Sequence, residues 1–255
     1  MNKREEILDK LNCHRIIPEN DPAINKDRII SVVLQIRSLL YPDYYTNELE
    51  PADLLDLIEK NISGEIRKVE RKKYKQITDS LIDRLPFIQD ALNRDIQAIY
   101  DGDPSVHTKT EIILSFPGFL AILCHRVAHE LYSMNVPVIP RIISEYAHEH
   151  TGIDIHPGAQ IGEYFCIDHG TGIIIGETAV IGNHVRIYHG VTLGVKKFYE
   201  DQQGKLIKGG KRHPNIGNHV VIYSNASIFG GDTYIEDYSV IKANSLITES
   251  LVKES

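Results

Sequence analysis

Histidines gather in the second half of this 255-residue chain, and two of them stand close to acidic residues. Eight of the twelve histidines lie at or beyond residue 148. Asp154-Ile155-His156 and Asp168-His169 each place a carboxylate close to an imidazole, and His169 follows Asp154 by 15 residues. A carboxylate that reaches an imidazole fixes its tautomer and raises its basicity, as a general base requires. The residue types therefore predict proton-transfer chemistry in this segment.

A six-residue period runs through the same half of the chain. Isoleucine or leucine recurs at 155, 161, 175, 181, 187, 193, 216, 222, 228, 235, 241 and 247. A period of six fits neither a helix nor a simple alternating strand, and it is the mark of hexapeptide repeats in a parallel β-helix. Three hexapeptides form one triangular coil, so twelve predict about four coils. Loops can leave the corners of such a coil without disturbing the stack.

The period is broken at two places that carry polar residues. The first break is the run from Ile167 to Gly172, which contains Asp168 and His169. The second is an excursion over about 195–215, which is basic in an otherwise acidic chain and ends at Arg212-His213-Pro214. Its cations are Lys196, Lys197, Lys205, Lys208, Lys211 and Arg212. We expect these cations to attract phosphate groups.

Stacked coils bring residues about 18 positions apart close together. Asp154 and His169 are separated by nearly that number. Neighbouring coils lie ~4.8 Å apart, so we expect the Asp154 carboxylate to reach the His169 imidazole from the next coil.

The first half of the chain reads as helical. Residues 1–150 hold 16 of the 20 leucines but only 3 of the 18 glycines. Apolar stripes at helical spacing predict helices over 28–40, 53–58 and 119–134. Pro86 suits a first helical turn, so we expect a helix that begins there and is stopped by the run from Asp101 to Pro104. We place the helical domain at 1–140 and the β-helix at 141–255.

Composition excludes several classes of protein. Hydrophobic residues are 42% and charged residues 25% of a chain with a formal charge of −7. That balance argues against disorder and against a nucleic-acid partner. We find no secretory leader and no stretch of ~20 apolar residues to span a membrane. The three cysteines fit a reducing, cytoplasmic compartment, and we expect Cys166 to be a buried thiol.

The motifs together resemble serine O-acetyltransferase, a family of hexapeptide-repeat acyltransferases. The resemblance covers roughly residues 80 to 250 and is carried by six runs. These are Asp101-Gly102-Asp103-Pro104, Asp154-Ile155-His156-Pro157, Asp168-His169-Gly170-Thr171-Gly172, Gly176-Glu177-Thr178-Ala179, Gly190-Val191-Thr192-Leu193-Gly194 and Arg212-His213-Pro214. The fold that it implies is α+β, with an α-helical N-terminal domain followed by a left-handed parallel β-helix.

The resemblance implies acetyl transfer from acetyl-CoA to the hydroxyl of L-serine, the first step of cysteine biosynthesis. His169 is then the general base and Asp154 its orienting carboxylate. Asp103 and Asp168 hold the ammonium group of serine, Arg212 takes its carboxylate, and His213 completes the pocket. Backbone groups near Gly194, Ser224 and Ala243 line the arm of CoA. Acetyl-CoA is a co-substrate, and we expect no tightly bound cofactor and no metal.

The resemblance also implies partners. The family forms trimers, often joined in pairs by the helical domain, with active sites between neighbouring β-helices. L-cysteine is expected as a competitive feedback inhibitor. The isoleucine tail that docks into O-acetylserine sulfhydrylase is absent from the printed sequence, which puts that complex in doubt. Tyr223 and Lys242 stand where the family has glycines, and we expect them to narrow the CoA groove.

Three alternatives are open from the sequence. One is a hexapeptide acyltransferase for a sugar or antibiotic hydroxyl, which would keep His169 without the amino-acid clamp. Another is a zinc enzyme like the γ-class carbonic anhydrases, with His169, His184 and His189 as ligands. The last is a non-catalytic scaffold, against which the intact Asp154, His169 and His213 argue.

Overall fold

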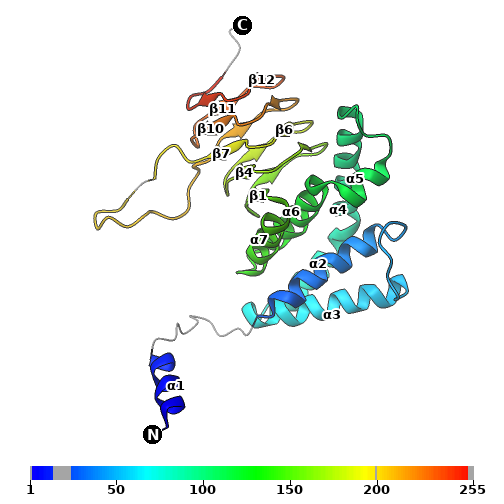
Figure 1. Ribbon diagram of the computed structural model, residues 1–255, viewed down its shortest axis with the longest axis vertical. Coiled ribbons are helices and arrows are strands. Elements are labelled where there is room, and N and C mark those ends of the chain that lie inside the picture. The colour runs from blue at the N-terminus through cyan, green and yellow to red at the C-terminus, as the bar shows by residue number, and fades with distance from the viewer. Residues whose placement is uncertain (1, 14–23, 199, 252–255) are drawn as a thin grey trace.

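The computed structural model describes residues 2–13, 24–198 and 200–251 (Figure 1). Helices come first and a stack of short strands follows. The helices of this part are α1 (Lys3–Cys13), α2 (Lys26–Leu40), α3 (Pro51–Val69), α4 (Tyr74–Gly102), α5 (Lys109–Ser115), α6 (Pro117–Ser133) and α7 (Ile139–Thr151). Residues 252–255, on which the prediction of a missing tail depends, lie outside the described residues.

The predicted helices are present, and their apolar stripes are buried. In α2 the Asn25 side chain accepts a hydrogen bond from the Arg28 amide, which caps the helix as short polar side chains do. Ile29, Val33 and Ile36 then face the core at 0 to 1% exposure. Burial of this stripe against α3 and α7, rather than intrinsic propensity, is the main source of stability for such a helix.

The prediction that a helix begins at Pro86 was wrong. Pro86 lies inside α4, a helix of 29 residues that starts at Tyr74. Ile77, Leu81 and Leu85 continue the buried stripe toward the N-terminus. Proline lacks an amide hydrogen and disfavours a helix interior, but here the burial of three further apolar side chains outweighs that loss. The helix ends at Gly102, where the run from Asp101 to Pro104 was expected to stop it.

The change from helix to strand lies just before Asp154. Helix α7 begins at Ile139 and ends at Thr151, and the following Gly152 has φ +68°, the left-handed conformation that glycine adopts freely at a helix end. The predicted domain boundary at 140 therefore falls within the first turn of α7. This helix packs along α6 and against the first strand.

Thirteen short strands form a left-handed parallel β-helix in the described residues, which confirms the predicted fold. They are β1 (Asp154–Ile155), β2 (Gln160–Ile161), β3 (Cys166–Asp168), β4 (Ile174–Ile175), β5 (Val180–Ile181), β6 (Arg186–Tyr188), β7 (Thr192–Gly194), β8 (Asn215–Ile216), β9 (Val221–Ile222), β10 (Ser227–Phe229), β11 (Tyr234–Ile235), β12 (Val240–Ile241) and β13 (Leu246–Ile247). All pairings between them are parallel and form three sheets, β1-β4-β7-β10-β13, β2-β5-β8-β11 and β3-β6-β9-β12. The repeating aliphatic residues point into the stack.

One repeat position was missed in the sequence. Ile167 sits on β3 at 3% exposure, in register with Ile187 on β6, so it is a thirteenth aliphatic position rather than part of an interruption. The interruption is the longer corner between Ile167 and Ile175. It makes the first coil 20 residues long, since Asp154 pairs with Ile174.

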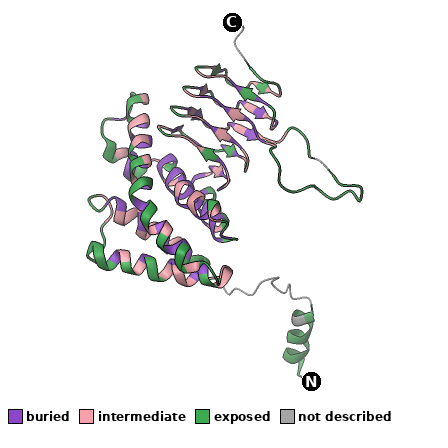
Figure 2. Cartoon of the chain, turned by 180° about the vertical axis from the view of Figure 1, so that it is seen from behind, coloured by how far each residue is buried: buried purple, intermediate pink, exposed green. Residues whose placement is uncertain are grey.

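The three corners of the coil form three edges that run along the β-helix. The first edge consists of the turns that follow β3, β6, β9 and β12. The second edge consists of the turns that follow β1, β4, β7 and β10, and the third edge of the turns that follow β2, β5, β8 and β11. The excursion predicted over about 195–215 leaves the second edge between β7 and β8 as a long loop, almost entirely exposed (Figure 2).

A buried ion pair ties the helices to the β-helix. Asp95 of α4 is 0% exposed and accepts hydrogen bonds from Arg126 Nε at 2.6 Å and Nη2 at 2.9 Å. It also accepts one from the Phe165 amide, while Arg126 Nη2 donates to the Gly162 carbonyl. Both charged groups are therefore paired and hydrogen-bonded at the junction.

Replacing Asp95 by alanine is expected to lower the free energy of unfolding by about 3–5 kcal/mol, because it leaves the Arg126 charge buried without a partner. Urea unfolding followed by circular dichroism measures this change. Glu145→Ala breaks the exposed Arg141–Glu145 pair and serves as the control, with an expected loss below ~0.5 kcal/mol. Equal losses for the two variants would show that the junction pair does not hold the domains together.

Within the described residues, no single helix has the length and apolar composition to cross a membrane. Only α5 and α6 taken together reach that composition, and they are bent by 72° at the break between them.

Candidate functional site

The first edge carries an acidic and basic cluster around His169. Asp168 ends β3, and its Oδ1 lies 3.7 Å from Nε2 of His169, whose side chain is 75% exposed. Arg186 on the neighbouring β6 lies 3.9 Å from the other oxygen of Asp168. His169 has φ +57°, so the corner holds its backbone in the left-handed region that non-glycine residues seldom adopt. The same conformation recurs at corners away from this cluster, such as His184 and His219, so it belongs to the turns of the β-helix.

The end of α4 brings Asp103 to the same cluster. Arg186 Nη1 donates to the Gly102 carbonyl at 2.5 Å, and a side chain at 102 would collide with the guanidinium, since a Cβ there would lie 1.1 Å from Nη2. Hydrogen bonds from Ser105 hold the pKa of Asp103 below its usual value, and the nearby His169 and Arg186 lower it further. The structure thus places Asp103 and Asp168 in the neighbourhood of His169, and the roles that the resemblance implies for them stay predictions.

Asp154 does not lie directly beside His169, as an 18-residue coil would place it. It begins β1, and the residue directly beside it in the next coil is Ile174, five residues after His169. Since Ile155 points into the core, the Asp154 side chain points outward, next to the first edge. In the described part of the chain, no hydrogen bond or ion pair joins Asp154 to His169. The role of Asp154 therefore stays a prediction.

The second edge holds His213 in one defined state. The backbone amide of Thr178 donates to His213 Nδ1 at 3.1 Å, and the Thr178 hydroxyl lies 2.9 Å from the same nitrogen. Nδ1 is therefore an acceptor, and the proton of the neutral ring is on Nε2. Burial, together with the Arg212 charge, lowers the pKa of His213 to about 4. The ring lies over Gly176, where a Cβ would come within 1.9 Å of it.

Arg212 is held beside His213 by an acidic partner. Its Nη2 donates to Oε2 of Glu177, and the Tyr132 hydroxyl donates to Oε1 of Glu177 at 2.6 Å. The hydrogen bond from Tyr132 holds the pKa of Glu177 below its usual value, and Arg212 acts in the same direction. The second edge thus presents one guanidinium and one neutral imidazole N–H, a pair of donors suited to a carboxylate.

The predicted CoA positions divide between two edges. Ser224 and Ala243 lie on the first edge in successive turns, and the Asn244 amide donates to the Ser224 carbonyl at 2.9 Å. Gly194 ends β7 on the second edge. Tyr223 and Lys242 flank the first edge, and Tyr223 stacks on Tyr188 with ring centroids 5.1 Å apart.

The three histidines of the zinc alternative do not share one edge. His169 and His189 lie on the first edge with ring centroids 5.7 Å apart. His184 lies on the third edge, stacked between Tyr164 and His219 at 4.3 and 4.6 Å. A single ion cannot be bound by all three within one chain at this geometry.

The two ends of the basic loop line a cavity at the second edge. The cavity has a volume of about 540 Å³ and is lined by Lys196, Lys197, Lys211, Arg212, Gly230, Gly231 and Asp232. Lys211 Nζ donates to the Thr178 carbonyl at 2.5 Å, which ties the end of the loop to the corner that holds His213. Four cations against one carboxylate make this cavity attractive to anions.

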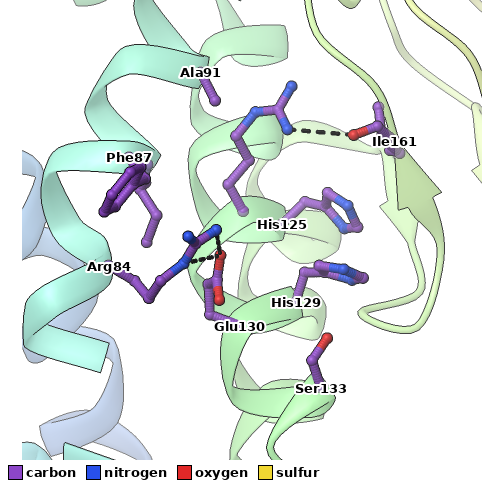
Figure 3. A pocket seen from close by; sticks show the side chains of 10 residues that line it. Arg84, Phe87, Ala91, His125, His129, Glu130, Ser133 and Ile161 are labelled. Atoms are coloured by element: carbon purple, nitrogen blue, oxygen red, sulfur yellow. Dashed lines mark hydrogen bonds and ion pairs between the residues drawn. The ribbon is translucent and has the colours of Figure 1, made fainter. Parts of the chain in front are cut away.

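Another cavity, of about 390 Å³, lies between α4, α6 and β2 (Figure 3). Arg84 and Glu130 form an ion pair at its mouth, and His125 and His129 point into the space beside the β-helix. None of the predicted site residues lines it. Burial lowers the pKa of His125 well below its usual value, so this imidazole is neutral.

Cys166 is a buried thiol, as predicted. It is 3% exposed, and burial raises its pKa to about 12. A thiol with that pKa supplies almost no thiolate at neutral pH, so Cys166 is not a nucleophile.

Sequence reasoning missed Arg186, Glu177 and Tyr132 as site residues. Arg186 pairs with Cys166 of the preceding coil. This register can be predicted only if the length of the corner between the two strands is known. Glu177 belongs to one of the motifs that carry the resemblance. Its proximity to Arg212 cannot be seen in the sequence, because the long loop separates the two residues along the chain. Tyr132 lies on α6, and the sequence contains no pattern that places it near the second edge.

Comparisons with known proteins agree with this architecture, which is that of a hexapeptide-repeat protein with a helical N-terminal domain. Residues 35–124 match the family model described as serine acetyltransferase, N-terminal. A plasmid serine acetyltransferase of Synechococcus elongatus is 48% identical over 176 residues, 69% of this chain and 55% of that protein. A serine acetyltransferase of Helicobacter pylori is 42% identical over 160 residues, 63% of this chain and 88% of that protein.

Solved structures give the same result. Native serine acetyltransferase 1 from Entamoeba histolytica superposes with a TM-score of 0.79 at 30% identity, over 98% of this chain and 92% of that one. The same enzyme in complex with L-cysteine gives 0.73 at 28% identity, over 97% and 96% of the two chains. A serine acetyltransferase in complex with CoA gives 0.60 at 27% identity, over 88% and 94%.

The chain belongs to the serine acetyltransferase family. The matched part spans about half the length of the first three curated relatives, at 55%, 53% and 53%.

Proposed function

We propose that this chain transfers the acetyl group of acetyl-CoA to the hydroxyl of L-serine, giving O-acetyl-L-serine and CoA. The observation that carries the proposal is the first-edge cluster, in which Asp168 lies 3.7 Å from the exposed imidazole of His169 and Asp103 lies near enough for His169 to lower its pKa. An amino acid with a free hydroxyl fits such a cluster, because its ammonium group pairs with the carboxylates while its hydroxyl faces the imidazole. Relatives named as serine acetyltransferases support the choice of substrate.

His169 is the proposed general base. It takes the proton of the serine hydroxyl as the hydroxyl oxygen attacks the thioester carbonyl, and it returns that proton to the leaving thiolate. Asp154, on the outer face of β1 next to this edge, is the proposed orienting carboxylate. No covalent acyl-enzyme is required, which agrees with the buried, protonated state of Cys166.

The second edge is the proposed site for the carboxylate of serine. Arg212 supplies the charge, and His213 donates from Nε2, because Thr178 occupies Nδ1. Within one chain the two edges are separated by β4 and its flanking residues, roughly 10 Å of extended backbone. A serine molecule, about 5 Å long, is too short to reach both.

A trimer solves this separation. A threefold assembly of parallel β-helices can place the first edge of one copy against the second edge of the next. We therefore propose a homotrimer, alone or as a pair of trimers, in which each serine lies between two copies. CoA then follows the first edge past Ser224 and Ala243 and meets Gly194 of the neighbouring copy. The cationic cavity at the loop is the proposed attraction for its phosphates.

L-cysteine is the proposed feedback inhibitor, competing with serine for the same groups. A relative solved with L-cysteine supports this. The proposed compartment is the cytoplasm, where acetyl-CoA is available.

The test is the release of CoA thiol from acetyl-CoA by the purified protein with L-serine, with other hydroxyl acceptors, or with none. Release that requires L-serine supports the proposal. Release with a sugar but not with serine would assign the chain to another acyl acceptor. If none of the acceptors tested gives release of thiol, acetyl transfer is contradicted altogether.

A further inference from the structure

His189 is a second imidazole on the first edge, and the proposed mechanism leaves it unused. It follows β6 one coil above His169, and the two ring centroids are 5.7 Å apart with the planes at 61°. The coils are bonded to each other here, because the Gly190 amide donates to the Thr171 carbonyl at 2.9 Å. The position of His189 is therefore set by the backbone of the stack.

One ring nitrogen of His189 is buried without a partner. Nδ1 has no hydrogen bond within the described residues. Nε2 is not buried in the same way, and the side chain as a whole is half-buried. An orphaned buried N–H is rarer in proteins than an orphaned acceptor lone pair. The favoured tautomer of the neutral ring therefore has an unprotonated Nδ1 and carries its proton on Nε2, where the N–H is available to a ligand.

The proposed track of CoA passes His189. The arm lies along Ser224 and Ala243, one and two coils beyond His189, and the acceptor hydroxyl lies at His169, one coil before it. Each step is ~4.8 Å. The thioester has to lie between the arm and His169, which is the level of the His189 ring.

We propose that His189 is a further catalytic residue, whose Nε2–H donates a hydrogen bond to the thioester carbonyl oxygen as that oxygen becomes an oxyanion. The inference rests on the proposed function. Donors preorganised toward developing negative charge are among the largest contributors to catalysis of acyl transfer.

The step balances without any further reactant. The serine hydroxyl gives its proton to His169 Nε2, and its oxygen forms a bond to the carbonyl carbon. The π electrons of the carbonyl move to its oxygen, which accepts the hydrogen bond from His189 without taking the proton. The oxyanion then collapses, the C–S bond breaks, and the thiolate takes the proton from His169. The products are O-acetylserine and CoA thiol.

The experiment compares His189→Ala with His189→Gln, because the glutamine amide reaches as far as the imidazole Nε2 and can donate in its place. His189→Ala is expected to lower kcat about 10²-fold and to leave the KM for acetyl-CoA within about twofold, because the interaction is made only in the transition state. His189→Gln is expected to restore kcat to within about fivefold of the wild type.

His184→Asn on the third edge is the control. Asparagine tolerates the left-handed backbone of that corner, at φ +57°, so the variant is expected to keep kcat, although it loses the stacking of His184 on Tyr164 and His219. A merely structural role for His189 would lower the Tm of the alanine and glutamine variants alike and would give no rescue of kcat.

The outcomes separate this inference from the proposed function. A wild type that releases thiol with serine, combined with an unchanged kcat for His189→Ala, overturns the role of His189 alone. So does a glutamine variant that is folded but as slow as the alanine variant. A wild type without serine-dependent release overturns both proposals.

Discussion

His169→Ala is expected to lower kcat for serine acetylation by about 10³-fold, the contribution of a well-placed general base. The serine hydroxyl ionises far above neutral pH, so without a base in contact its oxygen is a poor nucleophile. Because Asp103, Asp168 and the CoA track are untouched, the KM values for serine and acetyl-CoA are expected to stay within a few-fold. Steady-state thiol release at saturating substrates measures the change.

His219→Asn is a matched control for this loss, since His219 occupies the corresponding left-handed corner on the third edge with φ +56°. Its kcat is expected to equal that of the wild type. If His169→Ala keeps more than a tenth of the wild-type kcat while His219→Asn is fully active, His169 is not the base.

Arg212→Leu is expected to raise the KM for serine by about 30–100-fold, the loss of a charge-assisted contact to a carboxylate. The KM for acetyl-CoA is expected to change much less. The substitution also leaves Glu177 without its cationic partner, but Tyr132 still donates to it at 2.6 Å, so the corner is expected to remain folded. The measurement is serine saturation at fixed acetyl-CoA.

Arg212→Lys keeps the charge but not the planar fork, and an intermediate KM is expected. A serine KM unchanged in Arg212→Leu would show that the second edge does not hold the substrate carboxylate.

Much of the fold was predictable because it repeats. Each hexapeptide places an inward-pointing aliphatic residue at the same position of its short strand, so the pattern of isoleucines defines the β-helix without any long-range information. The helix around Pro86 was not predictable in this way. Local preference at a proline favours a helix start, and the burial of Ile77, Leu81 and Leu85 against other helices overrides it.

The site was predictable in its residue types but not in its register. Asp168 and Asp103 lie in the neighbourhood of His169, and their roles stay predictions from the resemblance. The contact between Asp154 and His169 was inferred from an 18-residue coil, whereas this coil has 20 residues because its corner is longer. Arg186, Glu177 and Tyr132 escaped notice because their partners lie on other coils or on α6, and one sequence contains no measure of those distances.

The central claim is that each active site combines the first edge of one copy with the second edge of another. Co-expression of His169→Ala with Arg212→Leu, at equal amounts and with different tags, tests it most directly. In a cyclic assembly, about one site in four then joins an intact first edge to an intact second edge. The account predicts that each variant alone is nearly inactive at low serine, and that the mixed protein recovers about a quarter of the wild-type rate. Mixed assemblies that contain both tags but remain as inactive as the separate variants would contradict it.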